Sequence, residues 1–489
     1  MFPLISLTIF IPLLGAGLLA AMPAVSPRAA HAVGLTASGL ALLGTAGIWL
    51  RGAGAGFSQV EEVDWIPAIG AAYRVGVDGI SLALVLLTAV LFFVSFVFSV
   101  KITERARAYV ALFLLLETAC LGVFVALDAI LFYVFFELTL VAMYFIISRW
   151  GHEGAQRAAT MFFLYTLLGS LPLLLAILGL YLGSDPNTFD MRQFIASPPL
   201  TGLAAGLAFL GMFIAFGIKI PVFPVHTWLP AAHVEAPTAG SVILAGVLLK
   251  LGTYGLIRFA LQMTPDAFRA AAPFVAALAV FTALYGAFAA LAQTDLKKLV
   301  AYTSVNHMGY VVLAVAAAAA ATNPGTRALA LDGAVLQMVS HGIVTGALFL
   351  LVGMLQDRTG TRDIGEFGGL LRVAPALGWL FILAAFASLG LPGLAHFPAE
   401  FLIFLGTFDV YPIAVVFVIV GIAVTAGLYL RAIQLAFFGK PAGRWQSMKG
   451  LNAREILTIT PLAALTVAVG VAPFLLLDFV HRATEVIGL

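Results

Sequence analysis

The chain has 489 residues, of which 62% are hydrophobic and only 10% are charged, and its formal net charge is +2. Soluble domains carry roughly 25% charged residues, so the composition excludes water as the main solvent of this chain. The few charges are scattered, which excludes a basic surface large enough to bind nucleic acid. The single cysteine, Cys120, can form no internal disulfide and cannot hold an iron–sulfur cluster by itself.

Apolar stretches of membrane-spanning length recur from one end of the chain to the other. A hydrocarbon core about 30 Å thick takes roughly 20 residues of helix, and these stretches have about that length. They predict an all-α integral membrane protein in which the longer polar links, at 51–77 and 184–202, are loops. About fourteen helices are expected, at 3–20, 32–50, 78–100, 109–127, 129–148, 161–182, 203–225, 239–260, 271–292, 299–320, 331–355, 374–406, 411–438 and 455–477.

Lysine and arginine are distributed unevenly over the links between these helices. Links after odd-numbered helices hold fifteen of them, whereas links after even-numbered helices hold six, with Arg258 assigned to the link after helix 8. Cytoplasmic loops of membrane proteins carry an excess of basic residues. The pattern predicts that the odd-numbered links are cytoplasmic and that both termini are on the outer side.

Three ionisable residues fall inside predicted helices, where a charge is costly and is a functional candidate by default. Glu137 lies about nine residues into the fifth helix, and the alternative to a proton-carrying role is a neutral carboxyl with one structural hydrogen bond. Lys219 lies near the cytoplasmic end of the seventh helix, so its alternative is snorkelling to the surface. Lys250 lies near the middle of the eighth helix, where neither surface is within reach.

Prolines interrupt the seventh and twelfth helices. Because proline removes a backbone donor, each group predicts a broken helix, and at membrane depth a break requires protein or water to satisfy the freed carbonyls. Two such helices about 180 residues apart indicate inverted repeats with sites near the membrane midplane. The residues expected to make the breaks are Pro221 and Pro224 beside Lys219, and Pro392 and Pro398 before Glu400.

Further polar residues could extend a proton path. His307 and His341 lie on consecutive helices and titrate in a useful range, although satisfied core histidines are the alternative. We expect no metal site, because no carboxylate or thiol completes a ligand spacing. The accessory candidates are Glu117 and Asp128 as second partners of Lys219, and His226 and His233 on a cytoplasmic loop that either guides protons or is simply braced by prolines.

Four segments resemble the antiporter-like subunits of respiratory complex I, particularly the M type, and the similarity extends over nearly the whole chain. The segments are KIPVFPVHTWLPAAHVEAPTAGSVILAGVLLKLGTYGLIRF, LFYVFFELTLVAMYF, QTDLKKLVAYTSVNHMGYV and LPGLAHFPAEFLIF. The resemblance implies two inverted five-helix repeats with broken helices 7 and 12. The expected parts are N-terminal helices at 1–100, a first repeat at 101–262, a second at 263–440 and a last helix at 441–489.

The resemblance also implies roles for individual residues. Glu137 resembles the glutamate that pairs with Lys219, Lys250 the central relay lysine, His307 and His341 the bridging histidines, and Glu400 the exit-side glutamate. Glu400 favours the M type, because the related L and N subunits typically have lysine there. Family members commonly read NFxGE where this chain reads His396-Phe397-Pro398-Ala399-Glu400, which leaves the partners of Glu400 in question.

The function implied is proton translocation coupled to NADH:quinone electron transfer in partner subunits, in a bacterial plasma membrane. No cofactor is expected in this chain; flavin mononucleotide (FMN), iron–sulfur clusters and quinone belong to the partners. The expected neighbours are L- and N-type subunits and lipids. The alternatives are a subunit of a multisubunit Na⁺/H⁺ antiporter, a subunit of a ferredoxin-driven or hydrogenase-type membrane complex, and a purely structural membrane spacer.

Overall fold

The predicted membrane helices are confirmed by a computed structural model, which describes residues 3–22, 24–441 and 443–488. In these residues thirteen helices are long and apolar enough to cross a membrane, and two shorter apolar helices, α16 (Pro375–Ser388) and α17 (His396–Phe408), lie where the twelfth helix was predicted. Helices satisfy their own backbone hydrogen bonds, which is why apolar sequence takes this form in lipid. The chain is therefore an integral membrane protein.

The uninterrupted spans follow one another with short links. They are α1 (Leu4–Ala21), α2 (Pro27–Arg51), α3 (Gly79–Ser99), α4 (Ala106–Val125), α5 (Ala129–Trp150), α6 (Ala155–Gly183), α12 (Pro265–Leu291), α13 (Leu296–Ala320), α14 (Pro324–Thr359), α18 (Pro412–Phe437) and α19 (Ala453–Val471). After α19, the chain resumes as α20 (Phe474–Glu485), a short helix that the sequence did not predict and that packs against α3 and α14. Short helices also lie in the links, among them α7 (Met191–Ala196) and α15 (Leu370–Val373).

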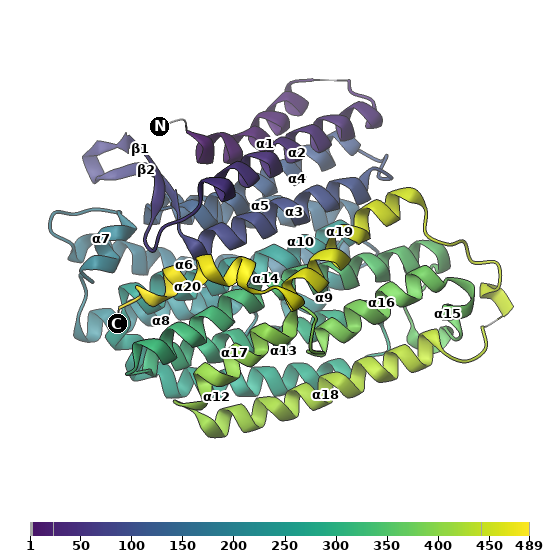
Figure 1. Ribbon diagram of the computed structural model, residues 1–489. Coiled ribbons are helices and arrows are strands. Elements are labelled where there is room, and N and C mark those ends of the chain that lie inside the picture. Colours follow the sequence, from purple (N-terminus) through teal and green to yellow (C-terminus); the bar gives the residue numbers. More distant parts are fainter. Residues whose placement is uncertain (1–2, 23, 442, 489) are drawn as a thin grey trace.

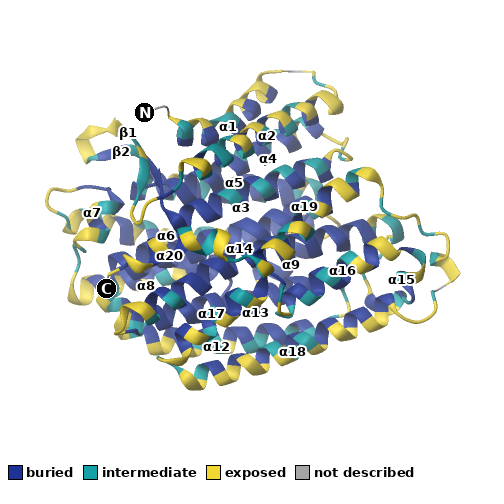
Figure 2. Ribbon diagram, in the orientation of Figure 1, coloured by how far each residue is buried: buried dark blue, intermediate teal, exposed yellow. Residues whose placement is uncertain are grey.

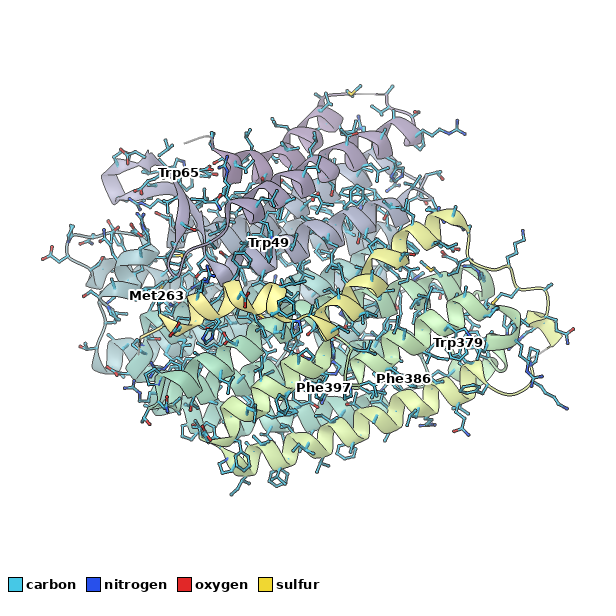
Figure 3. The ribbon with its side chains drawn as sticks, viewed as in Figure 1. Trp49, Trp65, Met263, Trp379, Phe386 and Phe397 are labelled. Carbon is cyan, nitrogen blue, oxygen red and sulfur yellow. The ribbon has the colours of Figure 1, made fainter. Side chains whose placement is uncertain are left out.

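The spans divide into a buried centre and a lipid-exposed rim. The most apolar windows of α13 and α14 are 94% and 100% buried, whereas that of α18 is 33% buried, and Figure 2 shows the same contrast. Large apolar side chains such as Trp379 and Phe397 lie on the outer surface (Figure 3). Ionisable side chains in the central helices are consequently far from lipid and bulk water.

An antiparallel hairpin replaces the loop expected at 51–77. Strands β1 (Ser58–Ile66) and β2 (Ala71–Val77) pair through a turn that closes at Gly70, where φ is +68°. Figure 1 shows the hairpin and α7 on the same side of the helix layer as the start of α1 and the end of α20. Arg74 on β2 pairs with Glu62 on β1, and this guanidinium lowers the pKa of the carboxyl.

Helix 7 is broken as predicted, but its second half was not expected. The first half, α8 (Gly202–Lys219), ends at the lysine, and the break that follows contains Pro221 and Pro224. The chain then forms α9 (Trp228–Glu235), which packs against α6 and α13. The loop assignment of His233 was therefore wrong. Pro230 lies in the first turn of α9, where proline is tolerated.

Helix 12 is broken between α16 (Pro375–Ser388) and α17 (His396–Phe408). Pro392 lies in the break, but Pro398 lies inside the first turn of α17, so assigning Pro398 to the break was wrong. First-turn N–H groups have no partner within the helix, and proline loses nothing there. Gly390 and Gly393 bend the break with φ values of +78° and +87°.

Helix 8 changes its winding on both sides of Lys250. It begins as α10 (Thr238–Ile243), becomes a π-helical turn η2 (Leu244–Leu248), continues as α11 (Leu249–Gly255) and ends in a second π-helical turn, η3 (Leu256–Leu261). Such turns occur frequently at functional sites. Arg258 belongs to η3 rather than to a link: it is 1% exposed and pairs with Asp78, which caps α3.

Candidate functional site

The centre of the site is a direct contact between Lys250 and His341. Gly246 of η2 and Gly342 of α14 let their helices approach so closely that a Cβ on Gly342 would lie 2.8 Å from the Gly246 carbonyl oxygen. Lys250 and His341 meet beside this crossing. Lys250 Nζ lies 2.6 Å from His341 Nδ1 and donates to the Ala245 carbonyl oxygen at 2.6 Å. Both side chains are 0% exposed.

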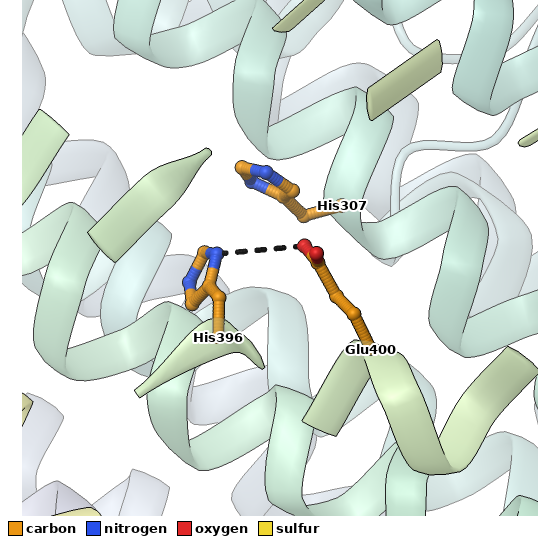
Figure 4. A group of neighbouring side chains, drawn as sticks. All are labelled: His307, His396 and Glu400. Carbon is orange, nitrogen blue, oxygen red and sulfur yellow. Dashed lines mark ion pairs between the residues drawn. The ribbon is translucent and has the colours of Figure 1, made fainter. Parts of the chain in front are cut away.

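Three more ionisable side chains gather beyond His341 (Figure 4). His307 comes from α13, whereas His396 and Glu400 lie one helical turn apart at the start of α17. The His307 and His396 rings have centroids 4.6 Å apart, and His396 Nδ1 lies 3.8 Å from a Glu400 oxygen. His307 Nε2 lies 3.0 Å from the carbonyl oxygen of Ser388, the last residue of α16. The break in helix 12 thus opens onto this cluster.

The cluster has the donor types of a metal site but a wide spacing. One nitrogen each from His307 and His396 and one Glu400 oxygen lie within 4.8 Å of one another. Tetrahedral zinc, with bonds of about 2.0–2.2 Å, needs donor atoms roughly 3.4 Å apart, so a metal could bind only after the three side chains move together. The arrangement as it stands suits proton exchange.

Lys219 lies deep in the protein at the end of α8, 2% exposed, and does not snorkel. Its Nζ donates to Thr139 Oγ1 on α5 at 3.3 Å and lies 4.8 Å from the centroid of the Phe136 ring. In the described part of the chain, no ion pair within 4.0 Å joins Lys219 to Glu137. The carboxyl of Glu137 is half-buried and interacts with Ser170 on α6 and electrostatically with Lys219.

The two lysines are connected by backbone packing. Gly252, two residues after Lys250, approaches the end of α8 so closely that a Cβ there would lie 3.0 Å from the Phe216 carbonyl oxygen and 3.1 Å from the Ile220 nitrogen. Ile220 directly follows Lys219, so α11 packs against the backbone on either side of that lysine. The ionisable residues of helices 7, 8, 10, 11 and 12 consequently share one buried region.

None of the accessory candidates forms a hydrogen bond or ion pair with Lys219 in the described part of the chain. Glu117 accepts from Ser38 at 2.9 Å, and Asp128 caps α5 and pairs with Arg74 of the hairpin. His226 lies in the break of helix 7 with its ring against Tyr285, and His233 stacks on Phe349. Neither of these two rings has a hydrogen-bond partner, and each packs against an aromatic side chain.

Three polar residues of this region were not predicted from the sequence. Thr139 accepts from Lys219, and its position two residues after Glu137 was the available signal. His396 was noted only as a departure from the family pattern. Lys297 was assigned to a link but is 0% exposed in α13 and donates to the Ala236 carbonyl after α9.

Comparison with known proteins identifies the family. The family described as NADH:quinone oxidoreductase/Mrp antiporter, transmembrane, matches residues 126–425. The NADH-quinone oxidoreductase subunit M of Rhodobacter capsulatus is 40% identical, over 98% of this chain and 94% of the relative. The structure of respiratory complex I from Thermus thermophilus with bound NADH contains a chain with a TM-score of 0.90 and 32% identity, covering 99% of this chain and 98% of that one.

A chain of the Mrp complex from a Dietzia species shares the fold, with a TM-score of 0.86 and 23% identity over 99% of this chain and 97% of that one. Identity this low supports the fold alone, whereas the curated M subunits match in sequence along almost their whole length. The chain therefore belongs to the NADH:quinone oxidoreductase/Mrp antiporter transmembrane family, and within it to the M subunits of NADH-quinone oxidoreductase.

Proposed function

We propose that this chain is a proton-translocating subunit of respiratory complex I and that it performs no redox chemistry itself. The observation that carries the proposal is the contact of 2.6 Å between Lys250 and His341, two groups that exchange protons, in a fully buried position. Intramembrane ionisable residues that pair with one another mark proton pathways in membrane transporters.

The proposed path runs from Lys219 to Lys250, through the histidines to Glu400, and from there to the outside. Electron transfer in partner subunits changes the field at Glu137, and Lys219 moves between its present position at Thr139 and a position nearer that carboxylate. When Lys219 moves away from the anion, it releases its proton through water towards Lys250. Water is required for this step because the structure gives no direct contact between the two lysines.

The same proposal includes the two repeats, the membrane and its orientation, the neighbouring subunits and the cofactors. Residues 101–262 and 263–440 form the two inverted repeats, each with one broken helix, between N-terminal helices at 1–100 and the C-terminal part at 441–489. The chain lies in a bacterial plasma membrane, both termini are outside, and L- and N-type subunits flank it. FMN, iron–sulfur clusters and quinone are held by other subunits.

The test is purification of the tagged chain in mild detergent with its partners, followed by assay of NADH-driven quinone reduction. We expect a large assembly that has this activity and the absorbance of flavin and iron–sulfur clusters. An assembly driven by another electron donor would contradict the assignment to complex I. Sodium-stimulated transport without any electron donor would instead support a cation antiporter subunit.

A further inference from the structure

His396 occupies the space between the Lys250–His341 contact and Glu400. Its ring is 0% exposed, lies nearly parallel to that of His341 with centroids 6.2 Å apart, and lies edge-on to that of His307. Its Nδ1 lies 3.8 Å from a Glu400 carboxylate oxygen. The ring therefore faces an ionisable side chain from each of three helices, α13, α14 and its own α17.

The polar atoms of this ring lack partners. Neither nitrogen of His396 has a hydrogen bond within 3.5 Å, although the ring interacts with the backbone of Ser388 and Ser340, and His341 Nε2 also has none. A buried polar group without a partner costs about 1–3 kcal/mol, so a histidine retained here for packing alone would be a poor choice. Open donors and acceptors on two facing rings are, in contrast, what proton exchange between them requires.

We infer that His396 is a proton-carrying residue of this chain, the link between His341 and Glu400, and that His307 orients the cluster beside it. The inference rests on the proposed function, since it adds a station to that path. His307 suits an orienting role because its Nε2 is held by the Ser388 carbonyl at the end of α16. His396 also interacts with the backbone of Ser388 and of Ser340, but neither of its nitrogens has a hydrogen bond within 3.5 Å, so both are open to its neighbours.

Each transfer moves one proton and leaves every group in a stable form. The Lys250 ammonium gives a proton to His341 Nδ1 and becomes a neutral amine. His341 then releases the proton on Nε2 to Nε2 of His396 through a bridging water, since the two ring centroids are 6.2 Å apart. His396 passes a proton from Nδ1 to the Glu400 carboxylate, which becomes a neutral acid, and His396 returns to its neutral form.

Glu400 is well placed to receive that proton. Its carboxylate packs against Gly390 in the break of helix 12, where an added Cβ would lie 2.5 Å from Oε2. Glycine at this position lets the carboxylate lie in the break itself. The imidazole of His396 fills the space between His341 and Glu400, and a shorter side chain such as asparagine would leave part of that space open.

The experiment uses the whole complex in proteoliposomes, with NADH-driven proton uptake as the readout and native gels as the check of assembly. His396→Met fills the volume but carries no proton, and we expect uptake to fall on the order of tenfold or more, as for loss of a proton-transfer group. His396→Gln should behave likewise, whereas His396→Asn, which admits water, should retain more activity. His31→Gln is the matched control, because His31 is a buried histidine of α2 whose Nε2 contacts the Ile102 carbonyl oxygen and no residue of the path.

Lys250→Met separates the inference from the proposed function. If Lys250→Met abolishes uptake while His396→Met and His396→Gln pump normally, His396 is not a station and the proposed function stands. If all three pump normally, both proposals are overturned. If His396→Met fails to assemble, His396→Gln decides: normal uptake overturns the inference, and a loss that His396→Asn partly restores supports it.

Discussion

Lys219 donates a hydrogen bond to Thr139 and forms no ion pair with Glu137. The ammonium donates to the threonine hydroxyl at 3.3 Å, while the carboxyl two residues earlier on the same helix interacts with Ser170. Residues two apart on a helix point in different directions, so α5 offers the lysine two separate positions. In the structure the Lys219 ammonium occupies the position at Thr139. The proposed mechanism requires it to move between this position and one beside Glu137.

Replacing Thr139 with valine should slow proton pumping. A hydrogen bond to a charged group contributes about 1.5–3 kcal/mol, so loss of the hydroxyl disfavours the position at Thr139 and should lower NADH-driven proton uptake roughly tenfold or more. Thr45→Val is the matched control, because Thr45 is buried in α2 and its hydroxyl has no partner. Equal uptake by the two variants would show that Lys219 does not use Thr139.

Glu137→Gln should abolish pumping while the complex still assembles. Glutamine keeps the size and polarity of the side chain but removes the charge to which Lys219 responds. The measurement is proton uptake per NADH oxidised in proteoliposomes, and Glu153→Gln, an exposed residue in the link after α5, is the control. Normal uptake by Glu137→Gln would mean that the carboxyl has only a structural role.

Arg258→Met should destabilise the protein strongly. The ion pair of Arg258 with Asp78 is buried, and removing one partner of such a pair leaves the other charge uncompensated, at a cost of about 3–5 kcal/mol. The measurement is the melting temperature of the purified complex. Arg269→Met removes an exposed pair with Asp266 and should change little. Equal melting temperatures for the two variants would contradict the burial of the pair.

Glu62 should stabilise the hairpin at neutral pH and lose this effect in acid. Arg74 lowers the pKa of Glu62 from its ordinary value of 4.5, so the carboxylate is favoured in the folded state. A lowered pKa contributes stability at pH above 4.5, and this contribution disappears as the pH falls below 4.5 through the lowered value. Wild type should melt above Glu62→Gln at pH 7, with the difference shrinking in acid. A difference independent of pH would mean that the charge is not responsible.

The membrane spans could be predicted from the sequence because lipid demands long apolar helices, and the buried charges could be found because they stand out within those helices. The hairpin and α9 were missed because they depend on partners distant in sequence: Arg192 of α7 reaches Glu62 on β1, and α9 packs on α6 and α13. A proline near a helix start was indistinguishable from one that breaks a helix, which misplaced Pro398.

Contacts within the site were the least predictable part. Lys250 and His341 are 91 residues apart, and only the crossing at Gly246 and Gly342 brings them together. The sequence pattern of one helix does not indicate which glycine of another helix will lie at their crossing point. His396 carried a signal, as a residue that departs from the family pattern, but its neighbours became clear only from the packing of α17 against α13 and α14.

The central claim is that protons pass through Lys250, and the most direct test is proton uptake by proteoliposomes that contain the complex with Lys250→Met. Methionine fills a similar volume without a titratable group. We expect an assembled complex whose NADH-driven uptake is reduced on the order of tenfold or more. Wild-type uptake by the assembled variant would contradict the relay and would leave the chain a structural spacer in the membrane.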